Sequence, residues 1–72
     1  MANNETQHLI SMANDIAANL EPYTDSAERT ADHIKRFWAP RMIGMLLEYV
    51  SDGGVGLSET GQQAVGVLQD AS

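Results

Sequence analysis

The chain contains no cysteine, and that absence excludes several kinds of chemistry. Without thiols there is no disulfide, no thiolate nucleophile, no thiolate-bound zinc and no cysteine-ligated iron–sulfur cluster. Small domains usually depend on disulfides, a metal, very good packing or a partner, and this chain of 72 residues lacks the first of these. We therefore expect close packing or a partner to supply much of its stability.

Positive charge is scarce and unevenly placed. Four Lys and Arg residues stand against ten Asp and Glu residues, which gives a net charge of −6. All four cations lie between Arg29 and Arg41. The overall acidity argues against nucleic acid as a partner, because nonspecific binding depends on neutralising phosphates. The simpler interpretation of the basic segment is a solvated helix face with ion pairs one turn apart, such as Asp32–Arg36.

Long apolar runs are also missing. No segment approaches the roughly 18 apolar residues of a membrane-spanning helix, so no membrane partner is expected. Residues 1–7 hold no cation and lead into no signal-type apolar segment, which makes a cytoplasmic location the default expectation. With 43% apolar residues, the composition is that of a chain with a packed core.

The spacing of the apolar residues predicts an all-α fold in one small domain, residues 1–72. Residues 1–5 look like a frayed polar tail. A first helix is predicted over about residues 5–20, because apolar residues recur at i, i+3, i+4 and i+7 from Leu9 onward. Asn14 falls outside this apolar stripe and is expected to point elsewhere.

A second helix is predicted over about residues 25–38. Asp25 is expected to cap its first turn, and Glu28 to complete an acidic variant of the capping box. Phe37 and Trp38 are adjacent, so on a helix their side chains point about 100° apart and cannot both face one small core. One of the two rings is therefore expected at the rim of the core or against a partner.

Two further helices complete a small bundle of three well-patterned helices and a marginal fourth. The third covers about residues 40–51, starts with Pro40 and ends before the glycine-rich residues 53–56. The fourth covers about residues 59–69, with Ser58 as its N-cap. Two internal glycines weaken it, each by up to about 1 kcal/mol relative to alanine.

Apolar residues surround most of the third helix. Seven of the nine residues 42–50 are apolar, while Arg41, Gly44 and Glu48 share one narrow stripe with Met45 beside it. A helix that is apolar nearly all round has to be covered nearly all round, and a short chain has little material for this. The sequence therefore predicts that another protein covers part of this helix.

No pattern typical of catalysis or metal binding is found. His8 and His33 lack the spacing of helical metal ligands, and exposed helix positions explain them more simply. The glycine-rich residues 53–56 are expected to follow a helix rather than a strand, and they lack the lysine of phosphate-binding loops. We therefore predict no catalytic residue, no cofactor-binding residue and no metal ligand in this chain.

A cluster of cationic and aromatic residues surrounds Pro40 and has two interpretations. Arg36, Phe37, Trp38 and Arg41 are of types that are common or enriched at interface hot spots. Arginines stacked on the rings would instead form an internal cation–π contact that joins two helices. The sequence leaves both interpretations open.

Three segments resemble a known family. Residues 37–42, Phe-Trp-Ala-Pro-Arg-Met, resemble the Phe-Trp-x-Pro-Arg-Met signature of the small delta subunit of NAD-dependent formate dehydrogenase. Residues 9–17, which include Met-Ala-Asn, and the glycine loop at residues 53–57 resemble two further segments of that family. The likeness covers residues 9–68, and Ala39 stands where an acidic residue is common in the family.

The resemblance implies an accessory subunit of a cytoplasmic complex rather than an enzyme. In such a complex a large catalytic subunit oxidises formate at a molybdenum or tungsten pterin cofactor, iron–sulfur clusters carry the electrons, and a flavin passes them to NAD. This chain would hold none of these cofactors, would dock on the large catalytic subunit and would support its assembly or stability. The residues expected to contact that partner are Arg36, Phe37, Trp38, Pro40, Arg41, Met42, Met45 and Tyr49.

Two other functions compete with this one. A freestanding helical homo-oligomer would cover the third helix with a second copy, and the isolated chain would then self-associate. A small nucleic-acid-binding regulator would use the four cations, but the net charge of −6 disfavours it.

Overall fold

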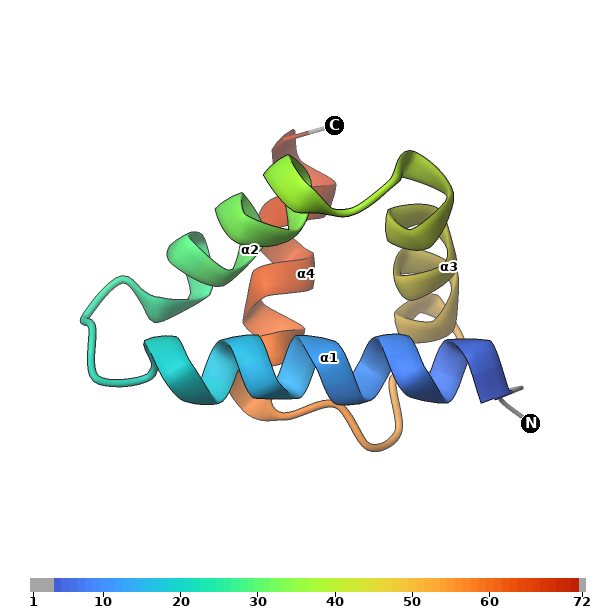
Figure 1. Ribbon diagram of the computed structural model, residues 1–72, viewed down its shortest axis with the longest axis horizontal. Coiled ribbons are helices and arrows are strands. Elements are labelled where there is room, and N and C mark those ends of the chain that lie inside the picture. Colours follow the sequence, from blue (N-terminus) through green and yellow to red (C-terminus); the bar gives the residue numbers. More distant parts are fainter. Residues whose placement is uncertain (1–3, 72) are drawn as a thin grey trace.

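The computed structural model describes residues 4–71, which form four α-helices and no strand (Figure 1). The helices are α1 (Asn4–Leu20), α2 (Ser26–Phe37), α3 (Pro40–Ser51) and α4 (Glu59–Ala71). The all-α fold class predicted from the sequence is confirmed. Of the predicted polar tail, residues 1–3 lie outside the described residues, whereas Asn4 and Glu5 belong to α1.

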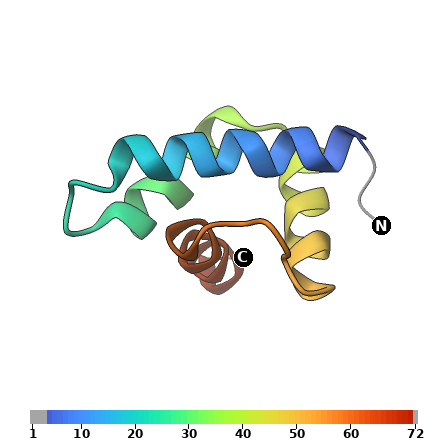
Figure 2. The ribbon, with the colours of Figure 1, turned by 90° about the horizontal axis from the view of Figure 1, so that it is seen from below.

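The four helices pack unequally. α1 lies across the other three helices and contacts each of them, while α2 and α4 share the most extensive contact between any two helices (Figure 1). Seen after a turn of 90°, α3 and α4 lie on the same side of α1, with α3 at the margin of the molecule (Figure 2). The main core therefore lies between α1, α2 and α4, and α3 is attached to it from one side.

Most core positions are those that helical spacing predicts. Ile10 and Thr30 are also buried, although the apolar pattern did not assign them. The hydroxyl group of Thr30 donates a hydrogen bond to the backbone oxygen of Ser26 at 2.7 Å, so its polar atom is satisfied within α2. The buried apolar residues are Leu9, Ile10, Ala13, Ala17, Ala31, Ile34, Trp38, Leu46, Leu57, Ala64, Val65 and Leu68.

The N-terminus of α4 is capped as predicted. The hydroxyl oxygen of Ser58 accepts a hydrogen bond from the backbone N–H of Gly61 at 3.1 Å. A side chain at Gly61 would place its Cβ 2.9 Å from Cδ1 of the buried Leu57, whereas a Cβ at Gly66 would meet nothing within 4 Å. Gly61 therefore permits the close approach of Leu57 to α4, and Gly66 has no such role in packing.

The predicted capping box at the start of α2 is wrong. Asp25 occupies the N-cap position, but its side chain makes no capping hydrogen bond. Its carboxylate instead accepts a hydrogen bond from Nε of Arg29 at 2.7 Å. The guanidinium group one turn along the helix thus competes successfully with the backbone N–H groups for this carboxylate.

Candidate docking surface

The turn between α2 and α3 is sharp and tightly defined. The backbone N–H of Trp38 donates to the oxygen of Ile34 at 2.9 Å and closes α2. Ala39 is extended, with φ −65° and ψ 148°, and Pro40 occupies the first turn of α3 as predicted. No side chain caps α3, because alanine stands at its N-cap position. We call residues 35–41 the α2–α3 corner.

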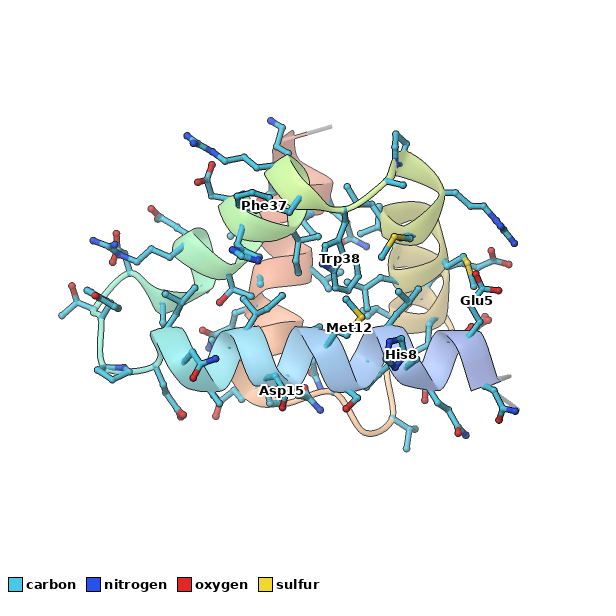
Figure 3. The ribbon with its side chains drawn as sticks, viewed as in Figure 1. Glu5, His8, Met12, Asp15, Phe37 and Trp38 are labelled. Atoms are coloured by element: carbon cyan, nitrogen blue, oxygen red, sulfur yellow. The ribbon has the colours of Figure 1, made fainter. Side chains whose placement is uncertain are left out.

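The two adjacent rings of the corner have opposite environments. Trp38 is 7% exposed and belongs to the core, whereas Phe37 is 73% exposed at the end of α2. Figure 3 shows Trp38 among the side chains enclosed between α1, α2 and α3, with Met12 of α1 in the same region. The ring of Phe37 lies against that of its helix neighbour His33, with the ring centroids 4.7 Å apart. The expectation that the two rings cannot both face the core is confirmed.

The arginines of the corner form exposed ion pairs. Arg36 pairs with Asp32 at 3.0 Å, as predicted, and Arg41 pairs with Glu5 of α1 at 3.8 Å. The side chains of these arginines are 70% and 78% exposed, respectively. Pairs this exposed contribute little to stability, typically about 0–1 kcal/mol. Both guanidinium groups are thus available at the surface.

The internal cation–π contact considered for the corner is not found among the described residues. The cation–π contact that the structure does contain lies at the other end of α2, where the guanidinium group of Arg29 is 4.2 Å from the ring centroid of Tyr23. Arg36 and Arg41 direct their charges to carboxylates instead. Of the two interpretations of the cluster, the internal one is therefore excluded in this structure.

The fold covers α3 only in part. Leu46 is fully buried, and it is the residue of α3 that the core encloses. Arg41, Gly44 and Glu48 are exposed along one stripe, as the sequence predicts. The other six apolar residues are half-buried against the core; they are Met42, Ile43, Met45, Leu47, Tyr49 and Val50.

The predicted partner-binding residues are brought together along the corner and α3, but they differ in access. Arg36, Phe37, Pro40 and Arg41 are exposed, while Met42 and Met45 are half-buried. The hydroxyl group of Tyr49, also half-buried, donates to the backbone oxygen of Val55. Because Trp38 is enclosed by the core, we assign it a structural role and leave it out of the partner-facing set.

Asn14 has a structural role that the sequence reasoning missed. Its side-chain nitrogen donates to the backbone oxygen of Gly56 at 2.9 Å, and its side-chain oxygen accepts from the backbone N–H of Ser58 at 2.8 Å. Gly53, Gly54 and Gly56 have positive φ angles of 127°, 65° and 92°, which form the turn that brings this loop back toward α1. Asn14 thus joins α1 to the loop that precedes α4.

The titratable side chains are the groups that a catalytic or metal site would need. They contain no group of three or more His, Cys, Asp or Glu side chains placed to hold a metal ion. His8 and His33 are both exposed on their helices. The hydrogen bond from Arg29 lowers the pKa of Asp25 and, reciprocally, Asp25 raises the pKa of Arg29, and both side chains of this pair are exposed. None of the helices formed by residues 4–71 has the length and hydropathy needed to cross a bilayer.

Comparison with known proteins identifies the family. No curated protein and no solved structure matches the chain. The family model described as "NADH-dependant formate dehydrogenase delta subunit FdsD" matches residues 8–65, which is more than half of the chain. The matched range includes α1 from His8 onward, the α2–α3 corner, α3 and the glycine loop. The chain belongs to the formate dehydrogenase delta subunit family.

Proposed function

We propose that this chain is a non-catalytic accessory subunit that docks on the large catalytic subunit of an NAD-dependent formate dehydrogenase and supports its assembly or stability. The observation that supports the docking role is the partial burial of α3. Of its seven apolar residues between Met42 and Val50, Leu46 alone is fully buried. Burying apolar surface is the main favourable contribution to association, and half-buried residues on one helix provide such surface. Membership of the delta subunit family supports formate dehydrogenase as the complex concerned.

The cofactors of the proposed complex would be held by its other subunits. A molybdenum or tungsten pterin, iron–sulfur clusters and a flavin are what the family resemblance implies for such a complex. Iron–sulfur clusters are held mainly by cysteine thiolates, and this chain has no cysteine to provide them. We accordingly place the chain outside the electron-transfer path, in a complex located in the cytoplasm.

Deleting the gene for this chain from its host tests the proposal. A tagged copy should purify together with the large catalytic subunit, and the deletion strain should yield less assembled enzyme or an enzyme with a lower melting temperature. Re-expression of the chain should restore both. If the tagged chain purifies without the large subunit and the deletion leaves enzyme yield and melting temperature unchanged, the proposal is wrong.

The half-buried face of α3 also favours the second candidate, a freestanding homo-oligomer. Light scattering on the isolated chain separates the two candidates. A stable dimer that persists when the purified catalytic subunit is added supports the homo-oligomer. A dimer that dissociates to form a heteromeric complex supports the accessory subunit.

A further inference from the structure

We propose that the α2–α3 corner is the docking surface, and that it fits an apolar pocket rimmed by carboxylates on the partner protein. Phe37 would enter the pocket while Lys35, Arg36 and Arg41 pair with the rim. This inference rests on the proposed function. It adds which surface of this chain makes the contact, and what kind of surface on the partner binds it.

Phe37 is exposed without a reason internal to the fold. Its side chain is 73% exposed, more than that of Tyr23 at 49%. Its close ring contact is with His33, which is itself exposed. Aromatic rings that enter a pocket on a partner are common anchors of protein interfaces.

The charge distribution identifies the kind of surface that would receive the corner. Residues 33–47 contain three cations and no acid, a charge of +3. The remainder of the chain holds one cation and ten acids, and so carries −9. An acidic partner surface would be attracted to the corner and repelled by nearly every other part of this molecule. Charge alone therefore favours one orientation of docking.

The existing ion pairs do not prevent this contact. Arg36 and Arg41 are paired with Asp32 and Glu5 in solvent-exposed positions, where such pairs are weak and the side chains remain accessible. In an interface shielded from water, the attraction between the same guanidinium groups and partner carboxylates is less screened, and it fixes the orientation of docking more than it adds affinity. Among the described residues, no carboxylate within 4.0 Å pairs with Lys35.

The corner is also held rigidly. Trp38, the residue after Phe37, is buried in the core. Pro40, two residues further on, restricts the backbone at the start of α3. A rigid surface loses less conformational entropy on binding than a flexible loop does. The backbone that carries Phe37 is therefore constrained before the partner binds.

A second copy of the chain is a less suitable partner for the α2–α3 corner than a different protein. A pocket lined by Ala17, Glu21 and Glu59, among others, is acidic in part, but it lies at α1 and the start of α4, away from the corner at the end of α2 (Figure 1). A contact between corner and pocket would be head-to-tail, and it would continue from copy to copy unless the geometry closed a ring. We therefore assign the corner to a different protein.

The test measures binding to purified formate dehydrogenase complex prepared from a strain that lacks this chain. Phe37→Ser should weaken binding at least about tenfold, as loss of an aromatic anchor does. The double variant R36E/R41E should also bind more weakly than the wild type. This difference should grow as the salt concentration falls, because the new negative charges repel the acidic rim. Wild-type binding should weaken as salt rises.

Two matched controls lie away from the corner. Val55→Ser changes an apolar residue that is 79% exposed, and Arg29→Glu reverses a paired arginine on the same helix as Arg36. Both should bind within about twofold of wild type. Circular dichroism and melting curves on each variant exclude loss of fold as the cause of weakened binding.

Each other outcome overturns the inference in a distinct way. If the wild-type chain binds and Phe37→Ser binds equally well, the corner is not the docking surface, although the proposed function stands. If binding is insensitive to salt and to R36E/R41E, the acidic rim is wrong. If the isolated chain forms concentration-dependent oligomers that Phe37→Ser abolishes, the occupant is a second copy. If the wild-type chain does not bind the complex at all, the proposed function fails as well.

Discussion

Asn14 and Ser58 lie 44 residues apart in the sequence and are joined by a hydrogen bond of 2.8 Å from the backbone N–H of Ser58 to the side-chain oxygen of Asn14. The same asparagine also donates to the backbone oxygen of Gly56. The Met-Ala-Asn segment and the glycine loop, which resemble two separate family motifs, are therefore parts of one structural unit. Their physical role is to hold α4 against α1.

Replacing Asn14 should release this connection. In Asn14→Ala the backbone N–H of Ser58 and the oxygen of Gly56 lose their side-chain partners, and we expect a loss of about 1–3 kcal/mol in the free energy of unfolding. Asn19→Ala, an exposed position on the same helix, should change stability by less than about 0.5 kcal/mol. Urea unfolding followed by circular dichroism measures both, and equal effects would contradict the role of Asn14.

The adjacent rings of the corner should differ sharply in their effect on stability. Trp38→Ala removes a large side chain from the core and should cost about 3–5 kcal/mol, enough to unfold much of a domain of this size. Phe37→Ala, one residue earlier, should leave the free energy of unfolding within about 0.5 kcal/mol, because the ring is largely in water already. Thermal melts of the two variants side by side test this, and a large loss in Phe37→Ala would mean that its ring is packed in solution.

The two glycines of α4 should respond oppositely to a methyl group. Gly66→Ala has free space around the new Cβ and should stabilise the chain by about 0.5–1 kcal/mol through helix propensity. Gly61→Ala would press its Cβ against Leu57, with the nearest atom 2.9 Å away, so it should be less stable than Gly66→Ala by about 1–3 kcal/mol. Melting temperatures measure this difference, and similar gains in both variants would show that Leu57 moves freely.

Helical spacing was sufficient to predict the helices, most of the core and the exposed stripe of α3, because these depend on neighbours within one or two turns. The boundaries of α1, α2 and α4 differ from the predicted ones by one or two residues at the start of α1, at both ends of α2 and at the end of α4. Leu57, just before α4, and Ala64, Val65 and Leu68 within it are all buried. The spacing of apolar residues predicts helices and core positions because each helix packs one face against the rest of the molecule.

The features that the sequence did not predict depend on distant partners or on competition between nearby ones. Nothing near Asn14 in the sequence indicates that its partners are Gly56 and Ser58. Asp25 matched a capping pattern, but Arg29 is also within reach of its carboxylate and prevails. The sequence predicts that only one of the rings of Phe37 and Trp38 faces the core. Which of the two is buried depends on the three-dimensional path of the corner, which the sequence pattern does not give.

The Asp25–Arg29 pair should be visible in an acid titration. The hydrogen bond from Arg29 holds the pKa of Asp25 below its usual value of 3.8. A group whose pKa is lowered on folding contributes stability that is present above pH 3.8 and is lost as the pH falls through the lower, folded value. In Arg29→Gln the pKa of Asp25 should rise toward 3.8, as measured by NMR of the side-chain carboxyl. Arg36→Gln is the control and should leave that pKa unchanged.

α3 should open locally in the isolated chain. Leu46 is its one fully buried residue, whereas α2 contributes Thr30, Ala31 and Ile34 to the interior. Backbone amides in the last two turns of α3 should therefore exchange with solvent through openings of lower free energy than those near Ile34. Hydrogen exchange at increasing denaturant measures this order.

The same experiment distinguishes a helix that is merely loose from one that is completed by a partner. On addition of purified formate dehydrogenase complex, protection should rise most in α3, because burying its half-buried apolar residues removes the openings. The amides of Asn19 and Leu20, at the far end of α1, serve as the internal control and should keep their exchange rates. Protection that rises at that end of α1 and not in α3 would place the contact on the opposite side of the molecule.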